Sequence, residues 1–224
     1  MQLPDAVPVM TLQNATLFPQ ALLPLYIFEP RYRRMLKDAL ASDRMFAVAM
    51  QRPGRSREIP CPIAGLGLIR ASVAHEDGTS HLILQGITRV QLCKSVQYRP
   101  YRMHRIQPLA PKEADNVTID ALVAKVHELV GHRLDLAPFP SPFPVKKGAD
   151  DSGEPVPFSK TEVLNYLEQL PGGDQVADLV TCALLSDAAQ RQTILETVEV
   201  ESRLKHVIHF LMAEIARRQK DAGA

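Results

Sequence analysis

The segment from Tyr98 to Arg105 has the residue types best suited to bind a ligand, because it interleaves two aromatic residues with three arginines. In proteins that bind single-stranded nucleic acid, aromatic rings stack on bases and guanidinium groups pair with phosphates. Residues 52–57 add three more arginines. The alternative interpretation is a barrel strand in which Tyr101, Met103 and Arg105 alternate with outward-facing residues, together with a solvated basic loop. Nucleic-acid binding is therefore kept as an alternative function, with these candidate residues: Arg52, Arg55, Arg57, Tyr98, Arg99, Tyr101, Arg102 and Arg105.

Other residues that could support chemistry lack the partners that chemistry requires. His206 and His209 have the i, i+3 spacing of two metal ligands on one helix face, but no third ligand is evident beside them. Asp150 and Asp151 lie in a proline-rich segment with nothing to orient them for acid–base catalysis. The sequence contains neither a G-x-x-x-x-G-K-[ST] phosphate loop nor a C-x-x-C zinc pair. We therefore expect no catalytic residue, no metal and no cofactor.

The elements that position the first half of the chain are best defined between Thr16 and Leu40, where prolines punctuate apolar runs. Pro24 interrupts an apolar run over 22–28, which is typical of an edge strand because proline cannot donate to a sheet ladder. Pro30 stands where a helix over 31–41 begins, a position that tolerates its missing N–H. This stretch therefore predicts strand, turn and helix.

The remainder of residues 1–115 predicts further strands. Asp77-Gly78 between two apolar runs is a strong hairpin signal. Glycines inside these runs indicate bulges or barrel corners, at Gly65, Gly67 and Gly86. The expected architecture is a six-stranded closed or nearly closed barrel with one helix. Its strands are expected at 7–12, 22–28, 45–50, 63–74, 81–96 and 101–109.

Residues 116–224 change to a helical period and predict a bundle of four or five helices. Ser159 and Glu162 form a capping box that opens a helix ending near Leu170. The proline-rich segment 137–158 interrupts the bundle, since it fits neither a helix nor a central strand. The fold class is therefore α+β, with a barrel domain at 1–115 and a helical domain at 116–224.

Composition places the chain among soluble proteins of a reducing compartment. It has no run of 18 apolar residues and no signal-peptide pattern, and its three cysteines are widely scattered. We expect a cytoplasmic protein with no membrane contact. Basic residues exceed acidic ones over 1–115 and the reverse holds over 116–224, which permits a polyanionic partner for the first half.

Short motifs in a fixed order carry a family resemblance. They are LFP at 17–19, LPL at 23–25 with a charged helix start, Asp-Gly at 77–78, GITRV at 86–90, QTILE at 192–196 and SRL at 202–204. Over about residues 7–215 the chain resembles the N-terminal domain of the ATP-dependent Lon protease family. The resemblance implies a PUA-like pseudo-barrel followed by a helical bundle.

The resemblance also implies a function. Lon proteases carry ATPase and Ser–Lys protease domains whose motifs are not found here, so we expect a free-standing, non-catalytic module that recognises protein substrates or adaptors. Its partners would be protein or peptide clients, together with a separate protease or adaptor. We expect the partner-binding surface near Phe18, Leu25, Phe28, Glu29, Arg31 and Arg34.

Overall fold

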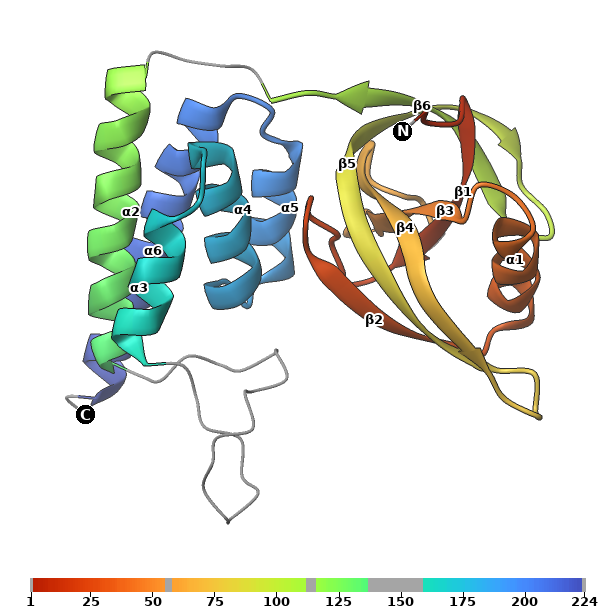
Figure 1. The fold of residues 1–224 in the computed structure, drawn as a ribbon, viewed down its shortest axis with the longest axis horizontal. Helices are drawn as coiled ribbons and strands as arrows, with labels where there is room; N and C mark the ends of the chain where they lie inside the picture. The colour runs from red at the N-terminus through yellow and green to blue at the C-terminus, as the bar shows by residue number, and fades with distance from the viewer. Residues whose placement is uncertain (1, 55–57, 112–115, 137–158, 223–224) are drawn as a thin grey trace. The chain divides into compact units, whose positions relative to one another are not determined.

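The computed structural model describes residues 2–54, 58–111, 116–136 and 159–222. The chain divides into two compact units, Met1–Ala110 and Pro111–Ala224 (Figure 1). The boundary expected after residue 115 falls in the same connection between the last strand and the first helix of the second unit. None of the described helices combines the length and apolar character that a membrane crossing requires.

The first unit is a barrel in which a long strand closes the sheet. The strand order is β2-β5-β4-β3-β1-β6, and β5 pairs a second time with β6. Because β5 has 18 residues, its first part pairs with β2 and its second part with β6. The six-stranded fold is therefore confirmed. Its strands are β1 (Ala6–Leu12), β2 (Leu22–Ile27), β3 (Met45–Met50), β4 (Ile63–Ala74), β5 (Ser80–Gln97) and β6 (Arg102–Leu109).

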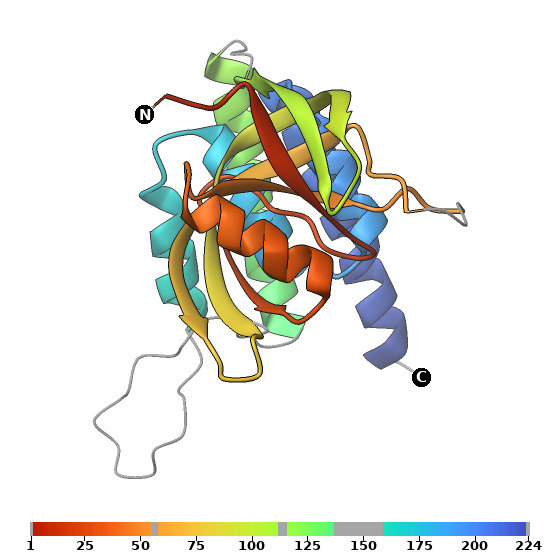
Figure 2. The ribbon, with the colours of Figure 1, turned by 90° about the vertical axis from the view of Figure 1, so that its right-hand side faces the viewer.

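Helix α1 (Pro30–Leu40) lies across one end of this barrel (Figure 2). Pro30 occupies its first turn, where the missing N–H leaves no intrahelical bond unmade. One face of α1 buries Tyr32, Met35, Leu36 and Ala39 against residues of the sheet. Burial of this face holds the start of α1, with its charged side chains, in a fixed position.

Glycines let the segment around Leu17 and Phe18 approach two strands closely. A Cβ added at Gly65 would lie 1.9 Å from the carbonyl oxygen of Leu17, and one added at Gly86 would lie 1.9 Å from that of Phe18. A register shift beside Gly67 confirms the bulge predicted there. Gly65 and Gly86 therefore must lack a side chain, because the backbone of Leu17 and Phe18 occupies the space that a Cβ would need.

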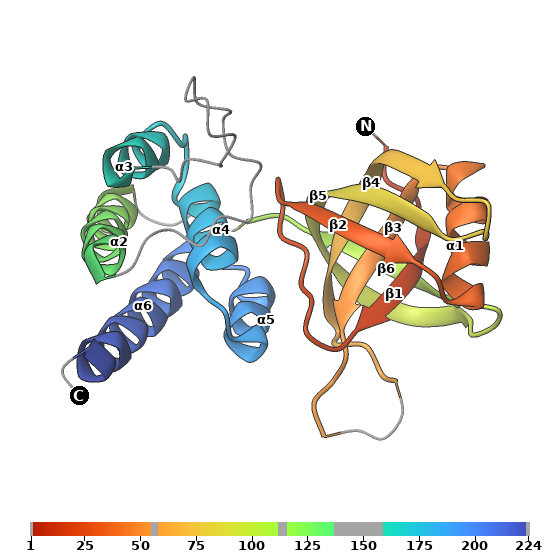
Figure 3. The ribbon, with the colours of Figure 1, turned by 90° about the horizontal axis from the view of Figure 1, so that it is seen from below.

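The second unit contains five described helices, and α2 packs against both α3 and α6 (Figure 3). The predicted capping box opens α3, which ends at Glu168 rather than Leu170. The proline-rich segment 137–158, which was expected to interrupt the bundle, lies outside the described residues. The helices are α2 (Asn116–Leu136), α3 (Lys160–Glu168), α4 (Gly173–Leu184), α5 (Ala188–Glu196) and α6 (Val200–Ala222).

Buried ion pairs join the helices of this unit. The Arg203 guanidinium lies 3.3 Å from the Asp178 carboxylate, and both side chains are almost fully buried. Arg203 also donates to the carbonyl oxygens of Thr197 and Val198. Burying a guanidinium is tolerated only when its donors are satisfied, so these contacts connect α4, α6 and the turn before α6.

Candidate functional site

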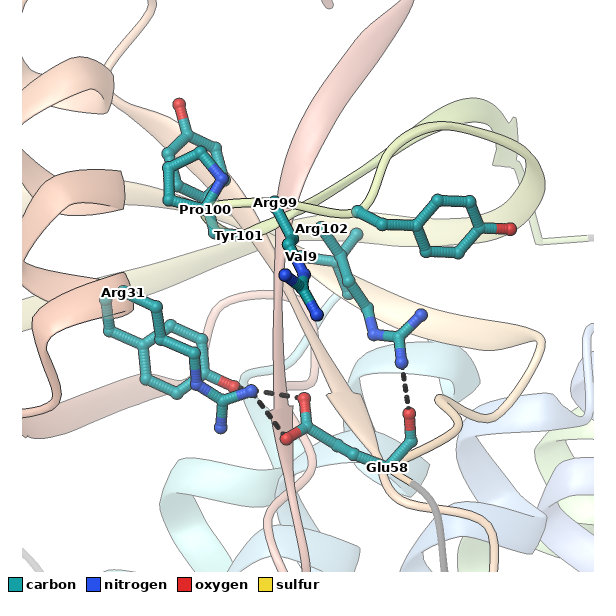
Figure 4. Close-up of a pocket in the computed structure, with 9 residues that line it drawn as sticks. Val9, Arg31, Glu58, Arg99, Pro100, Tyr101 and Arg102 are labelled. Atoms are coloured by element: carbon teal, nitrogen blue, oxygen red, sulfur yellow. Dashed lines mark hydrogen bonds and ion pairs between the residues drawn. The ribbon is translucent and has the colours of Figure 1, made fainter.

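A cavity of about 240 Å³ opens in the barrel unit beside the start of α1 and the turn before β6. Figure 4 shows the side chains of Arg31, Arg99 and Arg102 around Glu58, which follows β3 in the chain. We call this group of four charged residues the arginine pocket. The cavity is lined by Val9, Arg31, Tyr32, Glu58, Tyr98, Arg99, Pro100, Tyr101 and Arg102.

Glu58 organises two of the three arginines. Its Oε2 accepts a hydrogen bond of 2.6 Å from Arg31 Nη1, and its backbone carbonyl accepts one from Arg102. Arg31 also pairs with Glu29 at 2.9 Å. Charge-assisted bonds of this kind fix both the position and the orientation of a guanidinium. Arg31 and Arg102 are therefore held in place before any ligand arrives.

The third arginine is differently placed. None of the residues in the described ranges forms an ion pair with Arg99, and its side chain is exposed. Beside it, the exposed ring of Tyr98 lies 5.6 Å from the Arg102 guanidinium carbon. The pocket thus presents the Arg99 guanidinium to solvent, a group whose paired N–H donors suit an anionic ligand.

Two tyrosine hydroxyls of the cavity bond within the barrel unit. Tyr32 exchanges hydrogen bonds with the backbone of Thr11, and the Tyr101 hydroxyl donates a hydrogen bond of 2.9 Å to the Asp38 carboxylate. Burial raises the pKa of Tyr32 to about 12, partly offset by its bond to Thr11. Burial, and then the Asp38 carboxylate, raise the pKa of Tyr101. Both rings therefore serve as walls of the cavity.

A second feature of the barrel unit is an exposed cluster of rings, which we call the aromatic patch: Tyr26, Phe28 and His81. The Tyr26 and Phe28 rings stack with centroids 5.8 Å apart, and they are 48% and 58% exposed. Across the β2–β5 ladder, the Tyr26 ring lies 4.7 Å from that of His81. His81 Nδ1 in turn lies 2.7 Å from His75 Nε2. The three side chains therefore form one contiguous exposed cluster.

Comparison with known proteins identifies the family. A family model described as the ATP-dependent protease La (LON) substrate-binding domain matches residues 6–213. The chain belongs to this family. The resemblance inferred from the short motifs is thus confirmed, and the match is to the substrate-binding domain rather than to the ATPase or protease domain of Lon.

Several Lon proteases are similar to this chain in sequence. The Lon protease of Dictyoglomus thermophilum is 24% identical over 219 residues, covering 95% of this chain and 25% of that protein. Lon protease 2 of Myxococcus xanthus is 26% identical over 217 residues, covering 93% and 24%. The chain therefore spans about a quarter of the length of the curated relatives that it matches.

Solved Lon structures share the fold. The N-terminal domain of the Mycobacterium avium complex Lon protease superposes with a TM-score of 0.69 at 20% identity, covering 92% of this chain and 98% of that one. A Lon N-terminal domain protein from Xanthomonas campestris gives a TM-score of 0.58 at 18% identity, covering 91% and 97%. The barrel and helices are thus those of Lon N-terminal domains.

The structure separates the partner-binding residues expected from the Lon resemblance. Phe18 is buried with the Arg89 guanidinium 5.5 Å from its ring, which corrects its expected place at a surface. Leu25 is partly buried and packs against the barrel core, so it too contributes mainly to the fold. Phe28 is exposed in the aromatic patch. The three charged residues lie on or beside α1: Glu29 and Arg31 pair with each other, and Arg34 pairs with Asp38.

The alternative nucleic-acid surface is also divided. Arg99, Arg102 and Tyr98 line the arginine pocket, whereas Tyr101 is buried and cannot stack on a base, which corrects that expectation. Arg105 is exposed farther along β6, opposite Ala6. Arg52 is exposed and does not line the cavity, and Arg55 and Arg57 lie outside the described residues.

Sequence reasoning missed Tyr26, His81 and Glu58. The run LLPLYI contained a signal for the first, since strand alternation places Tyr26 on the face opposite Leu25 and Ile27. His81 follows the predicted Asp-Gly turn, so antiparallel pairing could have placed it near β2 only if the strand order had been known. No local pattern marks Glu58 as the partner of an arginine 27 residues away.

Proposed function

We propose that this chain binds protein clients through the aromatic patch and does not itself cleave or unfold them. Unfolded polypeptides expose the apolar side chains that folded proteins bury. Exposed apolar surface on rigid strands attracts such chains because contact removes both surfaces from water. The aromatic patch provides this surface on β2 and β5, where the sheet fixes its position.

The stacking of Tyr26 on Phe28 is the observation that carries the proposal. Aromatic side chains dominate binding at protein interfaces because they bury a large area with little loss of rotamer freedom. About half of each ring is exposed, so both can contact a partner without a change in the barrel. The match to a substrate-binding family supports the same function.

Affinity for an unfolded test protein measures this function. A small secreted protein, labelled and kept unfolded by reduction and amidation of its cysteines, is titrated with the purified chain while fluorescence anisotropy is recorded. Phe28→Ala and Tyr26→Ala should each weaken binding at least about fivefold, since interface aromatics contribute energies of this order. Tyr166→Ala is the matched control, because this ring on α3 is 57% exposed and outside the patch. Equal weakening by all three variants, or by none, contradicts the proposal.

We further propose that the chain acts in the cytoplasm, with a separate ATP-dependent protease or an adaptor receiving the clients it binds. The three cysteines are odd in number and lie far apart in the sequence, which fits a reducing compartment. Cross-linking in cells that produce the chain, followed by identification of the linked proteins, tests this arrangement. Recovery of clients without any protease or adaptor contradicts it.

Nucleic-acid binding is a second candidate, favoured by the exposed Tyr98 ring with Arg102 beside it. Stacking on Tyr98 and phosphate contacts from Arg99 and Arg102 are the interactions that it requires. A single-stranded RNA oligonucleotide should then bind most tightly at low salt, where phosphate contacts are strongest, and Tyr98→Ala should weaken it. Absence of binding at low salt removes this candidate.

A further inference from the structure

We infer that the arginine pocket binds a carboxylate of the client: an Asp or Glu side chain or the C-terminal carboxylate. This inference rests on the proposed function and adds a chemical preference to it. The clients bound best would carry an acidic group close to an apolar segment.

Charge favours an anion in the pocket. The cavity is lined by three arginines and by one carboxylate, that of Glu58, so the lining carries excess positive charge. Arg31 is neutralised by Glu29 and Glu58, but Arg99 has no ion-pair partner in the described ranges. A guanidinium presents paired N–H donors in the geometry of a carboxylate, and Arg99 has these donors available.

The pocket is already arranged for this ligand. Glu58 holds Arg31 through its carboxylate and Arg102 through its backbone carbonyl. Binding therefore needs little ordering of these two side chains, and a ligand retains more of its interaction energy when the site is preorganised. The cavity of about 240 Å³ has room for a carboxylate and its side chain.

The pocket and the aromatic patch are linked through the start of α1. Phe28 precedes Glu29, whose carboxylate lies 2.9 Å from the Arg31 guanidinium. A client that covers Phe28 is therefore brought to the edge of the arginine pocket. This adjacency favours a polypeptide carboxylate as the ligand, because an apolar segment of the same client can cover the Phe28 ring.

Three labelled peptides test the inference. All share a run of alternating Leu and Phe and carry a neutral dye at the N-terminus. The first ends in Asp-Asp with a free C-terminus, the second in Asn-Asn with a free C-terminus, and the third in Asn-Asn with an amidated C-terminus. Affinities are measured by anisotropy for the wild type, Arg99→Gln, and Arg105→Gln, a matched change of an exposed arginine on β6 outside the cavity lining.

We expect the wild type to bind the first peptide about tenfold more tightly than the third, as one charge-assisted contact would give. The second peptide shows whether the chain terminus or the side chain is the carboxylate that binds. Arg99→Gln should bring all three affinities to within about twofold, whereas Arg105→Gln should keep the preference. As a control for folding, both variants should have the same midpoint temperature of thermal unfolding as the wild type.

Each other outcome overturns the inference in a recognisable way. Equal affinities of the wild type for all three peptides overturn the carboxylate site and leave client binding in place. A preference that survives Arg99→Gln places the anion site elsewhere. Failure of every peptide to bind contradicts client binding itself, and the pocket assignment falls with it. Displacement of the first peptide by single-stranded RNA at micromolar concentration, lost in Arg99→Gln, assigns the pocket to phosphate instead.

Discussion

The hydroxyl of Tyr32 and the backbone of Thr11 exchange two hydrogen bonds, an N–H donated to the hydroxyl at 3.1 Å and an O–H donated to the carbonyl at 3.2 Å. These bonds connect α1 to β1 beneath the arginine pocket. Since Tyr32 is buried, its phenol must stay neutral for the bonds and the packing to persist. The position of α1 therefore depends on the ionisation of this group.

Replacement of Tyr32 by phenylalanine should remove an alkaline loss of stability. The pKa of Tyr32 is about 12 in the fold against 10.0 unfolded, so its contribution is complete below pH 10 and declines as pH rises toward 12. The free energy of unfolding of the wild type relative to Tyr32→Phe should fall by about 2 kcal/mol over this interval. Urea denaturation at a series of pH values measures the difference. Parallel curves for the two proteins contradict the prediction, and Tyr166→Phe, on the exposed ring of α3, is the control.

The buried pair of Arg203 and Asp178 should be among the most sensitive positions of the helical unit. Arg203→Met leaves the Asp178 carboxylate buried without its cation, and such changes destabilise proteins by about 3–5 kcal/mol. Lys205→Met, on the same helix, breaks only an exposed pair with Glu201 and should change stability by about 0.5 kcal/mol or less. Urea titration followed by circular dichroism compares the two. Similar effects of both substitutions would show that burial does not govern the pair.

Much of the fold could be predicted because its signals are local. The apolar runs at 45–50 and 63–74 match β3 and β4, and the prolines around α1 and the capping box of α3 have the roles expected of them. Strand order could not be read in this way. The parallel pairing of β1 with β3 and the second pairing of β5 with β6 depend on contacts between distant residues.

Gly86 should tolerate no side chain. A Cβ there would lie 1.9 Å from the carbonyl oxygen of Phe18, and the backbone of Gly86 is fixed by hydrogen bonds to Gln20 and Ala21. Gly86→Ala should therefore destabilise the barrel by about 3 kcal/mol, since neither backbone can move without loss of these bonds. Gly131→Ala is the control, because a Cβ in this part of α2 has its nearest neighbour at 3.4 Å and helix propensity favours alanine by about 1 kcal/mol. A Gly86→Ala protein as stable as the wild type would contradict the close approach.

The candidate site was predictable only in part. Residue types in the segment 98–105 indicated anion binding, and Arg31 was expected at a partner surface, but nothing in the sequence brings the two together. Glu58 joins them, through bonds to residues 27 and 44 positions away. The expectation that Phe18 lies at a surface was wrong because its burial also depends on distant residues. An apolar residue beside a proline turn can face the core or the solvent, and here the close approach of Gly86 to the Phe18 backbone accompanies burial of the ring.

Site-directed photo-cross-linking tests the central claim, that clients contact the aromatic patch, most directly. Benzoylphenylalanine is introduced at Phe28 in one protein and at Tyr166, an equally exposed ring on α3, in another. Each is irradiated with the labelled unfolded test protein. Binding at the patch predicts a cross-linked product from position 28 that an excess of unlabelled client suppresses, with little product from position 166. Equal products from both positions, or a product from position 166 alone, would contradict it.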